Sequence, residues 1–399
     1  MQTFERETQA KAEARLTWPA PLDPLHSIDD GEYDLSWYWR HADDPGACTY
    51  LKEANQYLYK SLLARYDRWE RKWTSWDGVV KVHQSAREIL GAYRLDRAIY
   101  SATSLQHFAA CPYRFYLYGI YRLKPRETVI RLEQLDPLTR GALFHAVQFK
   151  FFQDWRKRPS AGIEESLTSL DRILDAIAER YEEELAPAIP RVWRAEIEEL
   201  RTDLHEWLRL WYAQLPEWEP LHFELGFGLG PVDSKHYDLS SNPEPLMLLD
   251  TLRLRGSIDL VEQHRSRPVL RVVDHKTGKR PPRPAVSIGR GSTLQPALYA
   301  LAAEELLGKS VETGRLEYCT QRGGFTATDI KVDDTTRQRL NHGLDIIQRS
   351  IESAFLPAAP QEGACNLCDY RLVCGPNEET RVKKWKPAID DLDDLRSQP

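Results

Sequence analysis

Runs of apolar residues predict a set of β-strands in the second half of the chain. Residues 269–273 are apolar except at Arg271, and a glycine and two prolines follow them closely, as expected for a buried strand with a sharp end. Apolar positions within 254–260 indicate a second strand just upstream. Three more strands are expected at 221–229, 316–320 and 325–332.

Apolar residues that recur every three or four positions predict helices before and after these strands. Residues 163–185 and 192–215 are two long amphipathic stretches, with apolar positions on one face and charged residues on the other. Ser101 or Thr103 can cap a helix that contains Cys111, and Gly308 can end another. Further helices are expected over 50–73, from Gly141 onward, over 294–307 and over 335–353.

The strand at 269–273 runs directly into Asp274, His275 and Lys276. Side chains alternate between faces along a strand, so Asp274 and Lys276 point the same way and His275 points the other way. The neighbouring strand carries Asp259, so two carboxylates and a lysine are expected to meet. Carboxylates suit Mg²⁺, and a metal with a nearby lysine suits phosphodiester hydrolysis. Taken alone, an acid and a lysine at a strand end more often form a solvated pair.

Four other positions carry candidate chemistry. His145 lies one helical turn after Gly141 and could face a metal, although a lone histidine among apolar residues is more often part of the core. Glu224 lies inside an expected strand, where an acid is costly unless it is paired or liganded. Gln295 and Tyr299 share one helical face and can hydrogen-bond a phosphate or a catalytic side chain. The alternative for this pair is a polar rim on a packed helix.

Four of the six cysteines have the spacing of metal ligands. Cys365, Cys368 and Cys374 form a C-x2-C-x5-C motif, a density of thiols that favours metal ligation over packing. A fourth ligand is needed, and Cys111 is the natural partner. Spacing alone leaves both zinc and an iron–sulfur cluster open.

Composition limits where nucleic acid could bind. The 399 residues suffice for two or three domains. With 54 basic and 60 acidic residues the formal net charge is −6, so any DNA contact is expected to be local. One candidate patch, for which a solvated loop is the alternative, consists of Lys276, Lys279, Arg280, Arg283 and Arg290.

Two absences in the sequence also narrow the function. No apolar stretch is long enough for a membrane helix and the N-terminus is charged, so a cytoplasmic protein without membrane contact is expected. No G-x-x-x-x-G-K-[ST] motif occurs, which excludes an ATP motor of the P-loop type.

Taken together, the motifs resemble the PD-(D/E)XK nuclease superfamily, in its RecB/AddB-type branch. Five motifs occur in the expected order: R-G-A-L-F-H with His145, an acidic strand with Glu224, G-S-I-D with Asp259, D-H-K with Asp274 and Lys276, and Q-P-A-L-Y with Gln295 and Tyr299. The resemblance implies an α/β fold with a restriction-endonuclease-like mixed sheet flanked by helices. It also implies a deoxyribonuclease, expected to be an exonuclease, that depends on Mg²⁺ or Mn²⁺.

The resemblance assigns a role to each candidate. His145, Asp259 and Asp274 would hold the metal, with the backbone carbonyl of His275 as a further ligand. Lys276 would position or activate the attacking water, and Glu224 would support a second metal or that water. Gln295 and Tyr299 would contact the phosphate or brace the site. The segment around Cys111 resembles the one that supplies the first cluster cysteine in AddB-type nucleases, which implies a 4Fe-4S cluster on Cys111, Cys365, Cys368 and Cys374 rather than zinc.

The same resemblance suggests how the chain is organised and with what it works. Residues 1–95 are expected to be a helical extension, either a remnant of a helicase-like region or a partner dock. Residues 96–380 would form the nuclease domain, closed by the four cysteines, and 381–399 a flexible acidic tail. The substrate would be single-stranded DNA or DNA ends in double-strand-break repair and recombination, with a helicase as partner. Two alternatives are a noncatalytic DNA-binding or scaffold subunit and a zinc-stapled interaction protein.

Overall fold

A computed structural model describes residues 20–79, 84–124, 132–159, 161–230, 237–282 and 285–399. These residues belong to two compact units. One contains the described part of Met1–Val79 together with Lys383–Pro387, and the other contains the described part of Val80–Val382 together with Ala388–Pro399. The domain boundaries expected near residues 95 and 380 stay predictions.

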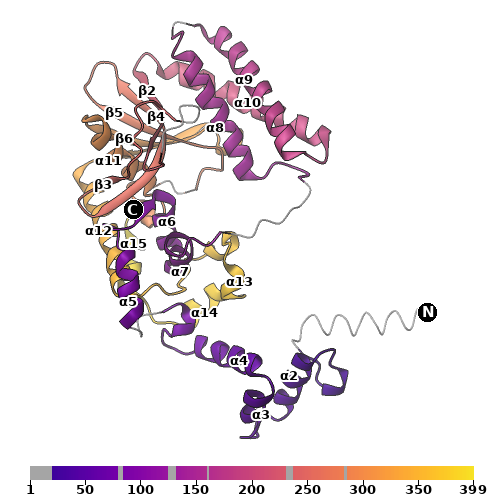
Figure 1. Cartoon of the computed structure of the whole chain (residues 1–399). Coiled ribbons are helices and arrows are strands. Elements are labelled where there is room, and N and C mark those ends of the chain that lie inside the picture. The colour runs from indigo at the N-terminus through magenta and orange to yellow at the C-terminus, as the bar shows by residue number, and fades with distance from the viewer. Residues whose placement is uncertain (1–19, 80–83, 125–131, 160, 231–236, 283–284) are drawn as a thin grey trace. The chain divides into compact units, whose positions relative to one another are not determined.

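The larger unit is built on a mixed seven-stranded sheet in the described residues. Its strands are β1 (Ile99–Ser101), β2 (Trp218–Phe227), β3 (Leu246–Leu248), β4 (Leu252–His264), β5 (Leu270–Lys276), β6 (Val311–Tyr318) and β7 (Thr326–Lys331). The order along the sheet is β1-β4-β5-β6-β7, and β2 and β3 also pair with β4. β5 and β6 are parallel, whereas β4 runs antiparallel to β5 and β6 runs antiparallel to β7. The predicted mixed sheet flanked by helices is confirmed (Figure 1).

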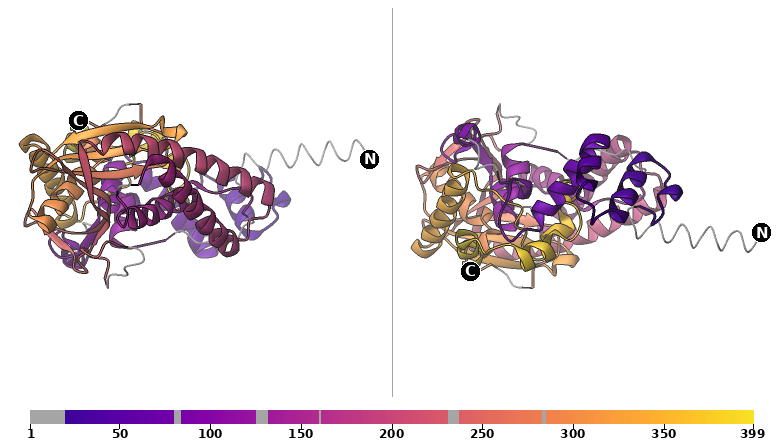
Figure 2. Two further views of the ribbon diagram at one scale, coloured as in Figure 1. Left: turned by 90° about the horizontal axis from the view of Figure 1, so that it is seen from above. Right: turned by 90° about the horizontal axis from the view of Figure 1, so that it is seen from below.

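Helices make up most of the remaining structure. In chain order they are α2 (Asp30–Arg40), α3 (Ala47–Ala54), α4 (Gln56–Arg68), α5 (Gln84–Leu90), α6 (Ala102–Ala110), α7 (Pro112–Phe115), α8 (Pro137–Trp155), α9 (Ile163–Leu185), α10 (Pro190–Gln214), α11 (Gln295–Leu307), α12 (Asp334–Glu352), α13 (Arg371–Cys374), α14 (Glu378–Trp385) and α15 (Asp390–Ser397). α9 and α10 extend outward beyond the sheet (Figures 1 and 2). Within the described residues, no helix combines the length and the apolar character that crossing a bilayer requires.

Large aromatic residues fill the core between the sheet and helices α8 to α10. Phe152 stacks on Phe223 of β2, and Trp207 and Trp211 of α10 pack edge-on against it. Leu260 of β4 and Val273 of β5 belong to the same buried cluster. Burial of this many apolar side chains is the main force that fixes α8 against the strands. α8 begins at Pro137 rather than Gly141, because the Asp136 carboxylate caps the preceding turn.

The other side of β5 and β6 is covered by α11. Residues Pro296–Ala303 of this helix are all buried, which fits a helix that is apolar on nearly every side. It packs on β5 and β6 and also contacts α12. It ends at Gly308, which adopts the left-handed conformation (φ 63°), as predicted. Its first turn therefore lies over the end of β5, where the candidate residues are.

The helix predicted around Cys111 is interrupted at that residue. α6 starts at a capping box formed by Ser101 and Ser104 and ends at Cys111. Pro112 then begins α7, since proline fits the first position of a helix but cannot continue one. The expectation that Cys111 lies inside a helix is thus wrong, and the break places its side chain between two short helices.

The C-terminal residues include ordered structure, in contrast to the expected flexible acidic tail. Leu392 and Leu395 of α15 are buried, and the Arg396 guanidinium donates hydrogen bonds to the carbonyls of Ala109, Ala110 and Ala359. The many acidic residues of this segment led to the prediction of a flexible tail, because the few apolar positions among them give a weak signal. Two leucines at i and i+3 are enough to dock a short helix when a packed surface is available.

The smaller unit is helical. The stretch predicted as one helix over 50–73 is divided, because Asn55 ends α3 and its side chain caps α4 by accepting from the N–H of Leu58. Asp34 accepts hydrogen bonds from Tyr50 and Asn55 and links α2 to this junction. Lys386 forms a buried ion pair with Asp77.

Candidate active site

The two predicted metal-binding aspartates lie where β4 and β5 separate. The backbone ladder between these strands runs from Gln263↔Leu270 to Leu260↔Val273, and the next residues on each strand are Asp259 and Asp274. Because the strands are no longer paired there, the N–H of His275 is available and donates to Asp259 Oδ2 over 2.7 Å. β4 and β5 are neighbours, as the sequence predicted, and Asp259 and Asp274 lie directly beyond their last paired residues.

Asp274 and Lys276 project from the same face of β5 toward α11. The Lys276 ammonium forms an ion pair with Asp274 and donates to Gln295 Oε1 over 3.1 Å. Gln295 Nε2 donates to Asp274 Oδ1 over 2.5 Å, so the three side chains form a closed triangle. The Gln295 backbone N–H is in turn held by Gln106 Oε1 at 3.0 Å. This arrangement holds the Lys276 side chain in one rotamer, whereas an unpaired surface lysine samples several.

His145 comes from α8 and faces the aspartates from the opposite direction. Its Nδ1 lies 3.6 Å from Asp259 Oδ2, and its side chain remains 30% exposed. The His275 ring points away from Lys276, as expected from strand alternation, and packs edge-on against Trp207. Ligand atoms of His145, Asp259 and His275 all lie within 4.8 Å of one another. Here the His275 ring, rather than its carbonyl alone, approaches the other two residues.

Glu224 occupies a strained position in β2. Its φ of 49° lies in the left-handed region, a conformation that costs a non-glycine residue about 1 kcal/mol or more. The strand pairs with β4 on either side of it, at Phe223↔Leu260 and Leu225↔Ile258. The carboxylate accepts a hydrogen bond from Ser257 Oγ over 2.7 Å. The sequence analysis missed Ser257, although it precedes Asp259 by two residues in G-S-I-D and therefore shares its face.

Tyr299 packs against the backbone that carries the site. A Cβ on Gly256 would lie 2.9 Å from the Tyr299 hydroxyl and 3.2 Å from Phe227, so only glycine leaves room for this phenol. The Phe227 and Tyr299 rings meet edge to face. Burial raises the pKa of Tyr299, so the hydroxyl stays protonated and can donate. One helical turn separates it from Gln295, as predicted.

The electrostatics of the site are those of crowded acids. Burial, followed by the charges of Asp274 and Glu224, raises the pKa of Asp259 well above its usual value. Burial also raises the pKa of Glu224 to about 7, against the opposing effect of the Ser257 hydrogen bond. Burial acts to lower the pKa of Lys276, but Asp274 outweighs it and the net shift is upward. Burial lowers the pKa of both His145 and His275, so both rings are neutral at pH 7.

The donor set fits a divalent cation. Neutral imidazole and carboxylate oxygen are both common metal ligands. Two ligands at about 2.1 Å from an octahedral ion lie about 3.0 Å apart, close to the 3.6 Å between His145 Nδ1 and Asp259 Oδ2. Burial, with a smaller contribution from neighbouring acids, raises the pKa values of Asp259 and Glu224, and a cation would favour the charged form of both.

Beyond β5, the predicted basic patch is partly described. Lys279 and Arg280 are exposed, and Arg290 is exposed in a left-handed turn (φ 59°). Arg283 lies outside the described residues. Burial raises the pKa of the Tyr318 phenol, and the charges of Lys276 and Arg280 oppose that shift.

The four predicted cysteines line one small cavity. Cys111, from the α6–α7 break, meets Cys365, Cys368 and Cys374 there. Burial raises the pKa of Cys111 to about 11 and that of Cys365 to about 12. Thiols in such a place are protonated unless a positively charged centre binds them. Their convergence from distant parts of the sequence fits a shared metal centre.

Comparison with known proteins agrees with this geometry. The family model for the PD-(D/E)XK nuclease superfamily matches residues 99–375. The chain therefore belongs to the PD-(D/E)XK nuclease superfamily.

Three curated relatives refine this class, and all three are B-type subunits of an ATP-dependent helicase/deoxyribonuclease. The chain is 28% identical over 242 residues to the one from Moorella thermoacetica, covering 56% of this chain and 19% of the relative. Identity to the one from Natranaerobius thermophilus is 26%, covering 72% of this chain and 25% of the relative. Identity to the one from Symbiobacterium thermophilum is 27%, covering 63% of this chain and 21% of the relative. The chain spans about a quarter or less of the length of these relatives.

Proposed function

We propose that this chain is a deoxyribonuclease that hydrolyses phosphodiester bonds with Mg²⁺ or Mn²⁺. The observation that carries the proposal is the convergence of His145, Asp259, Asp274 and Lys276 from α8, β4 and β5. Membership of the nuclease superfamily supports it, as does the name of the curated relatives, which are helicase/deoxyribonuclease subunits.

Each residue has a distinct task in this proposal. His145, Asp259 and Asp274 hold the ion, with His275 as a further ligand. A bound divalent ion supplies charge neutralisation on the phosphoryl oxygens and a bound water of lowered pKa. Lys276 stays protonated, so it orients the attacking water and neutralises charge that develops on the phosphate. Glu224 supports that water or a second ion, and Gln295 and Tyr299 contact the phosphate or hold Lys276 and Asp274 in place.

The cysteine cavity would hold a 4Fe-4S cluster. Four thiolates around one zinc ion at about 2.3 Å lie about 3.8 Å apart. The four cysteines line one cavity, and the likeness of the Cys111 segment to AddB-type nucleases favours the cluster, with structural zinc as the alternative. The cluster would act as a staple between Cys111 and the C-terminal segment.

The substrate proposed is single-stranded DNA or DNA ends, cut in exonuclease mode during double-strand-break repair or recombination. The sequence holds no P-loop motif, so unwinding would come from a helicase partner. The relatives' name combines helicase and deoxyribonuclease, which supports this pairing.

Cleavage of labelled DNA tests the catalytic assignment. We expect the wild type to degrade linear single strands in Mg²⁺ or Mn²⁺ and to spare closed circles. Lys276→Ala and Asp274→Ala should each lower the rate roughly 100-fold or more, because they remove charge stabilisation of the transition state. Lys309→Ala, which removes an exposed lysine that contacts Gln263, is the matched control and should cleave normally. Equal rates in all variants would mean a contaminant or a different site, and a folded wild type that cleaves nothing would favour a noncatalytic scaffold.

A further inference from the structure

A cleft of about 560 Å³ opens beside the proposed metal ligands. His145 and Glu224 are among its lining residues, and the others come from α8 and α9. A second hollow of about 250 Å³ shares Asp154, Ser169 and Arg172 with the first and continues along the same two helices. The two together form a groove, here called the α8–α9 groove, that leads away from the candidate active site.

The groove combines cationic side chains with an apolar surface, and three acids, Asp154, Glu165 and Glu224, also line it. Lys150 of α8 and Arg172 and Arg180 of α9 line it, with Phe149 and Ile177 between them. Arg172 is exposed and forms no ion pair with any residue the structure describes. Among the described residues, Lys150 and Arg180 form ion pairs only one turn along their own helices, with Asp154 at 3.3 Å and Glu184 at 3.7 Å. Such exposed pairs are weak and exchange readily for another anion.

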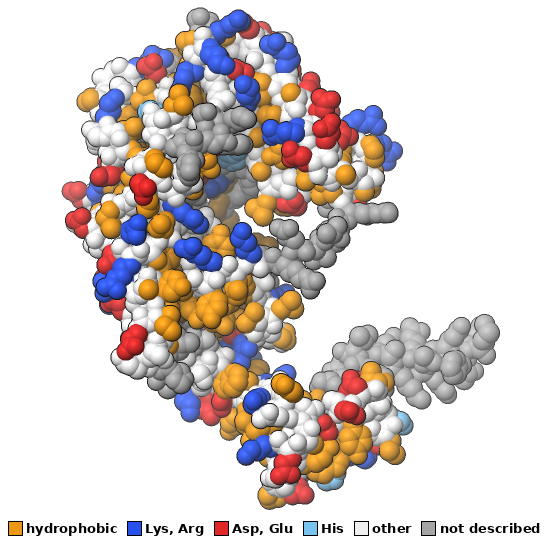
Figure 3. Space-filling view, in the orientation of Figure 1, with side chains coloured by type: hydrophobic (Ala, Val, Ile, Leu, Met, Phe, Trp, Pro, Cys, Tyr) orange, Lys and Arg blue, Asp and Glu red, His pale blue; other side chains and the backbone are white. Residues whose placement is uncertain are grey.

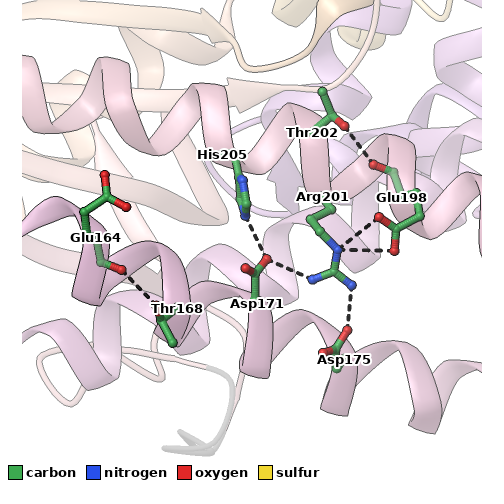
Figure 4. A network of polar contacts seen from close by, with 8 residues as sticks. All are labelled: Glu164, Thr168, Asp171, Asp175, Glu198, Arg201, Thr202 and His205. Atoms are coloured by element: carbon green, nitrogen blue, oxygen red, sulfur yellow. Dashed lines mark hydrogen bonds and ion pairs between the residues drawn. The ribbon is translucent and has the colours of Figure 1, made fainter.

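A polar network explains why these cations face the groove. On the opposite side of α9, Asp171 and Asp175 accept hydrogen bonds from Arg201 of α10, at 2.8 and 2.6 Å. His205 adds a contact to Asp171 at 2.7 Å. Figure 4 shows this network between the two helices. It pairs Asp171 and Asp175 of α9 with α10 and helps to fix the rotation of the helix that leaves Arg172 on the groove side.

Lys and Arg side chains are spread over the part of the molecule that contains α8 to α10, with acidic side chains among them (Figure 3). Since the whole chain has a formal charge of −6, a cation-lined path that opens onto the active site is a local feature. It would draw a polyanion toward the metal ligands.

We propose that the α8–α9 groove binds one strand of DNA and guides it to the metal site, with phosphates on Lys150, Arg172 and Arg180 and bases against Phe149 and Ile177. This inference rests on the nuclease function proposed above and adds the path and the strandedness of the substrate. A single strand can offer phosphates and bases at once. A duplex presents mainly its phosphates and would leave the apolar surface uncovered.

Binding without cleavage tests the groove separately from catalysis. Fluorescence anisotropy in EDTA would measure the affinity of the wild type for a labelled oligothymidylate, the matching duplex and an abasic strand across salt concentrations. For the single strand, the slope of log affinity against log salt should fall by about 2 in the triple variant Lys150→Ala/Arg172→Ala/Arg180→Ala, because each lost phosphate contact removes about 0.7. Arg172→Ala alone should lose about 0.7, and it keeps the measurement usable if the triple variant is unstable.

Arg209→Ala is the matched control. Arg209 is an exposed arginine of α10 paired with Glu206 at 3.6 Å, and it does not line the groove, so its slope should equal that of the wild type. The abasic strand and the duplex should bind more weakly than oligothymidylate. An unchanged slope in the triple variant would contradict the proposal that the groove binds one strand of DNA. A duplex that binds as tightly as the single strand would contradict it too.

Hydrolysis of bis(p-nitrophenyl) phosphate by the wild type but not by Lys276→Ala tests the catalytic site without using the groove. Failure of this reaction therefore counts against the nuclease proposal, while failure of the binding test counts against the groove.

Discussion

At the scale of single residues, the site has more carboxyl groups than the one lysine beside them can neutralise. Glu224 and Asp259 are partly buried near the buried Asp274, and Lys276 supplies one positive charge. The pKa values of Glu224 and Asp259 are raised as a result. Each carboxyl must lose its proton before it can bind a cation. Metal binding and proton release are therefore coupled at these residues.

This coupling predicts a pH-dependent metal affinity. Burial raises the pKa of Glu224 to about 7, so below pH 7 this carboxyl is protonated and binding must displace the proton. Mn²⁺ affinity should rise about tenfold per pH unit from about pH 5.5 to 7 for each coupled proton. Titration calorimetry in two buffers of different ionisation enthalpy would count the protons released. Glu224→Gln should make the profile less steep and leave the dependence due to Asp259, and a wild-type affinity independent of pH would contradict the coupling.

A second residue-scale prediction concerns Gly256. An added Cβ would meet the Tyr299 hydroxyl at 2.9 Å and the neighbouring ring atom at 3.0 Å. Gly256→Ala should therefore displace Tyr299, destabilise the protein by about 1–3 kcal/mol and lower kcat more than it raises KM. Urea unfolding and steady-state cleavage would measure both effects. The matched control is Gly91→Ala, where the new Cβ meets nothing within 4 Å and stability and kcat should not change.

The chemical residues of this site were largely predictable from the sequence, whereas their support was not. Asp259, Asp274 and Lys276 follow from two strands and the alternation of side chains along them. Ser257 and Gln106 escaped notice, because a serine or glutamine in an ordinary segment acquires its role only from what the fold places opposite it. The strained φ of Glu224 was likewise invisible, since it follows from how β2 passes β4.

At the scale of elements, short helices near the C-terminus hold distant segments together. Arg396 of α15 reaches the last carbonyls of α6, at Ala109 and Ala110, next to Cys111. These carbonyls have no partner within their own helix. Long amphipathic helices were well predicted because their apolar period is strong: 163–185 matches α9, whereas α15 has too few apolar residues to give a signal.

Arg396→Ala tests whether α15 is a working part of the nuclease unit. Removal of the guanidinium leaves the carbonyls of Ala109, Ala110 and Ala359 without this donor, which should lower the free energy of unfolding by about 2 kcal/mol. Urea unfolding would measure the change, with Arg191→Ala, an exposed residue of α10, as control. Stability equal to that of the control would show that α15 is dispensable.

At the scale of the whole molecule, the four cysteines come from the start and the end of the nuclease region. Cys111 precedes β2 to β7, and Cys365, Cys368 and Cys374 follow them, so the proposed shared centre would close a loop around most of the sheet. Their spacing in the sequence pointed to the candidate ligands but not to the break at Cys111-Pro112 that positions the first of them. Closing a loop of this length removes entropy from the unfolded chain worth roughly 5 kcal/mol.

The loop closure predicts a large, specific cost when the first cysteine is lost. Protein purified without oxygen should be brown, with iron, acid-labile sulfide and broad absorption near ~400 nm. Cys111→Ser should lose that absorption and lower the Tm by roughly 10 °C, which corresponds to roughly 5 kcal/mol in a unit of this size. Cys48→Ser, an exposed cysteine outside the cavity, should behave as the wild type. Zinc would close the same loop. A colourless wild type that contains zinc, with the same Tm loss in Cys111→Ser, would therefore show that zinc rather than a cluster links the cysteines. An unchanged Tm in Cys111→Ser would show that the four cysteines do not join the two ends of the domain.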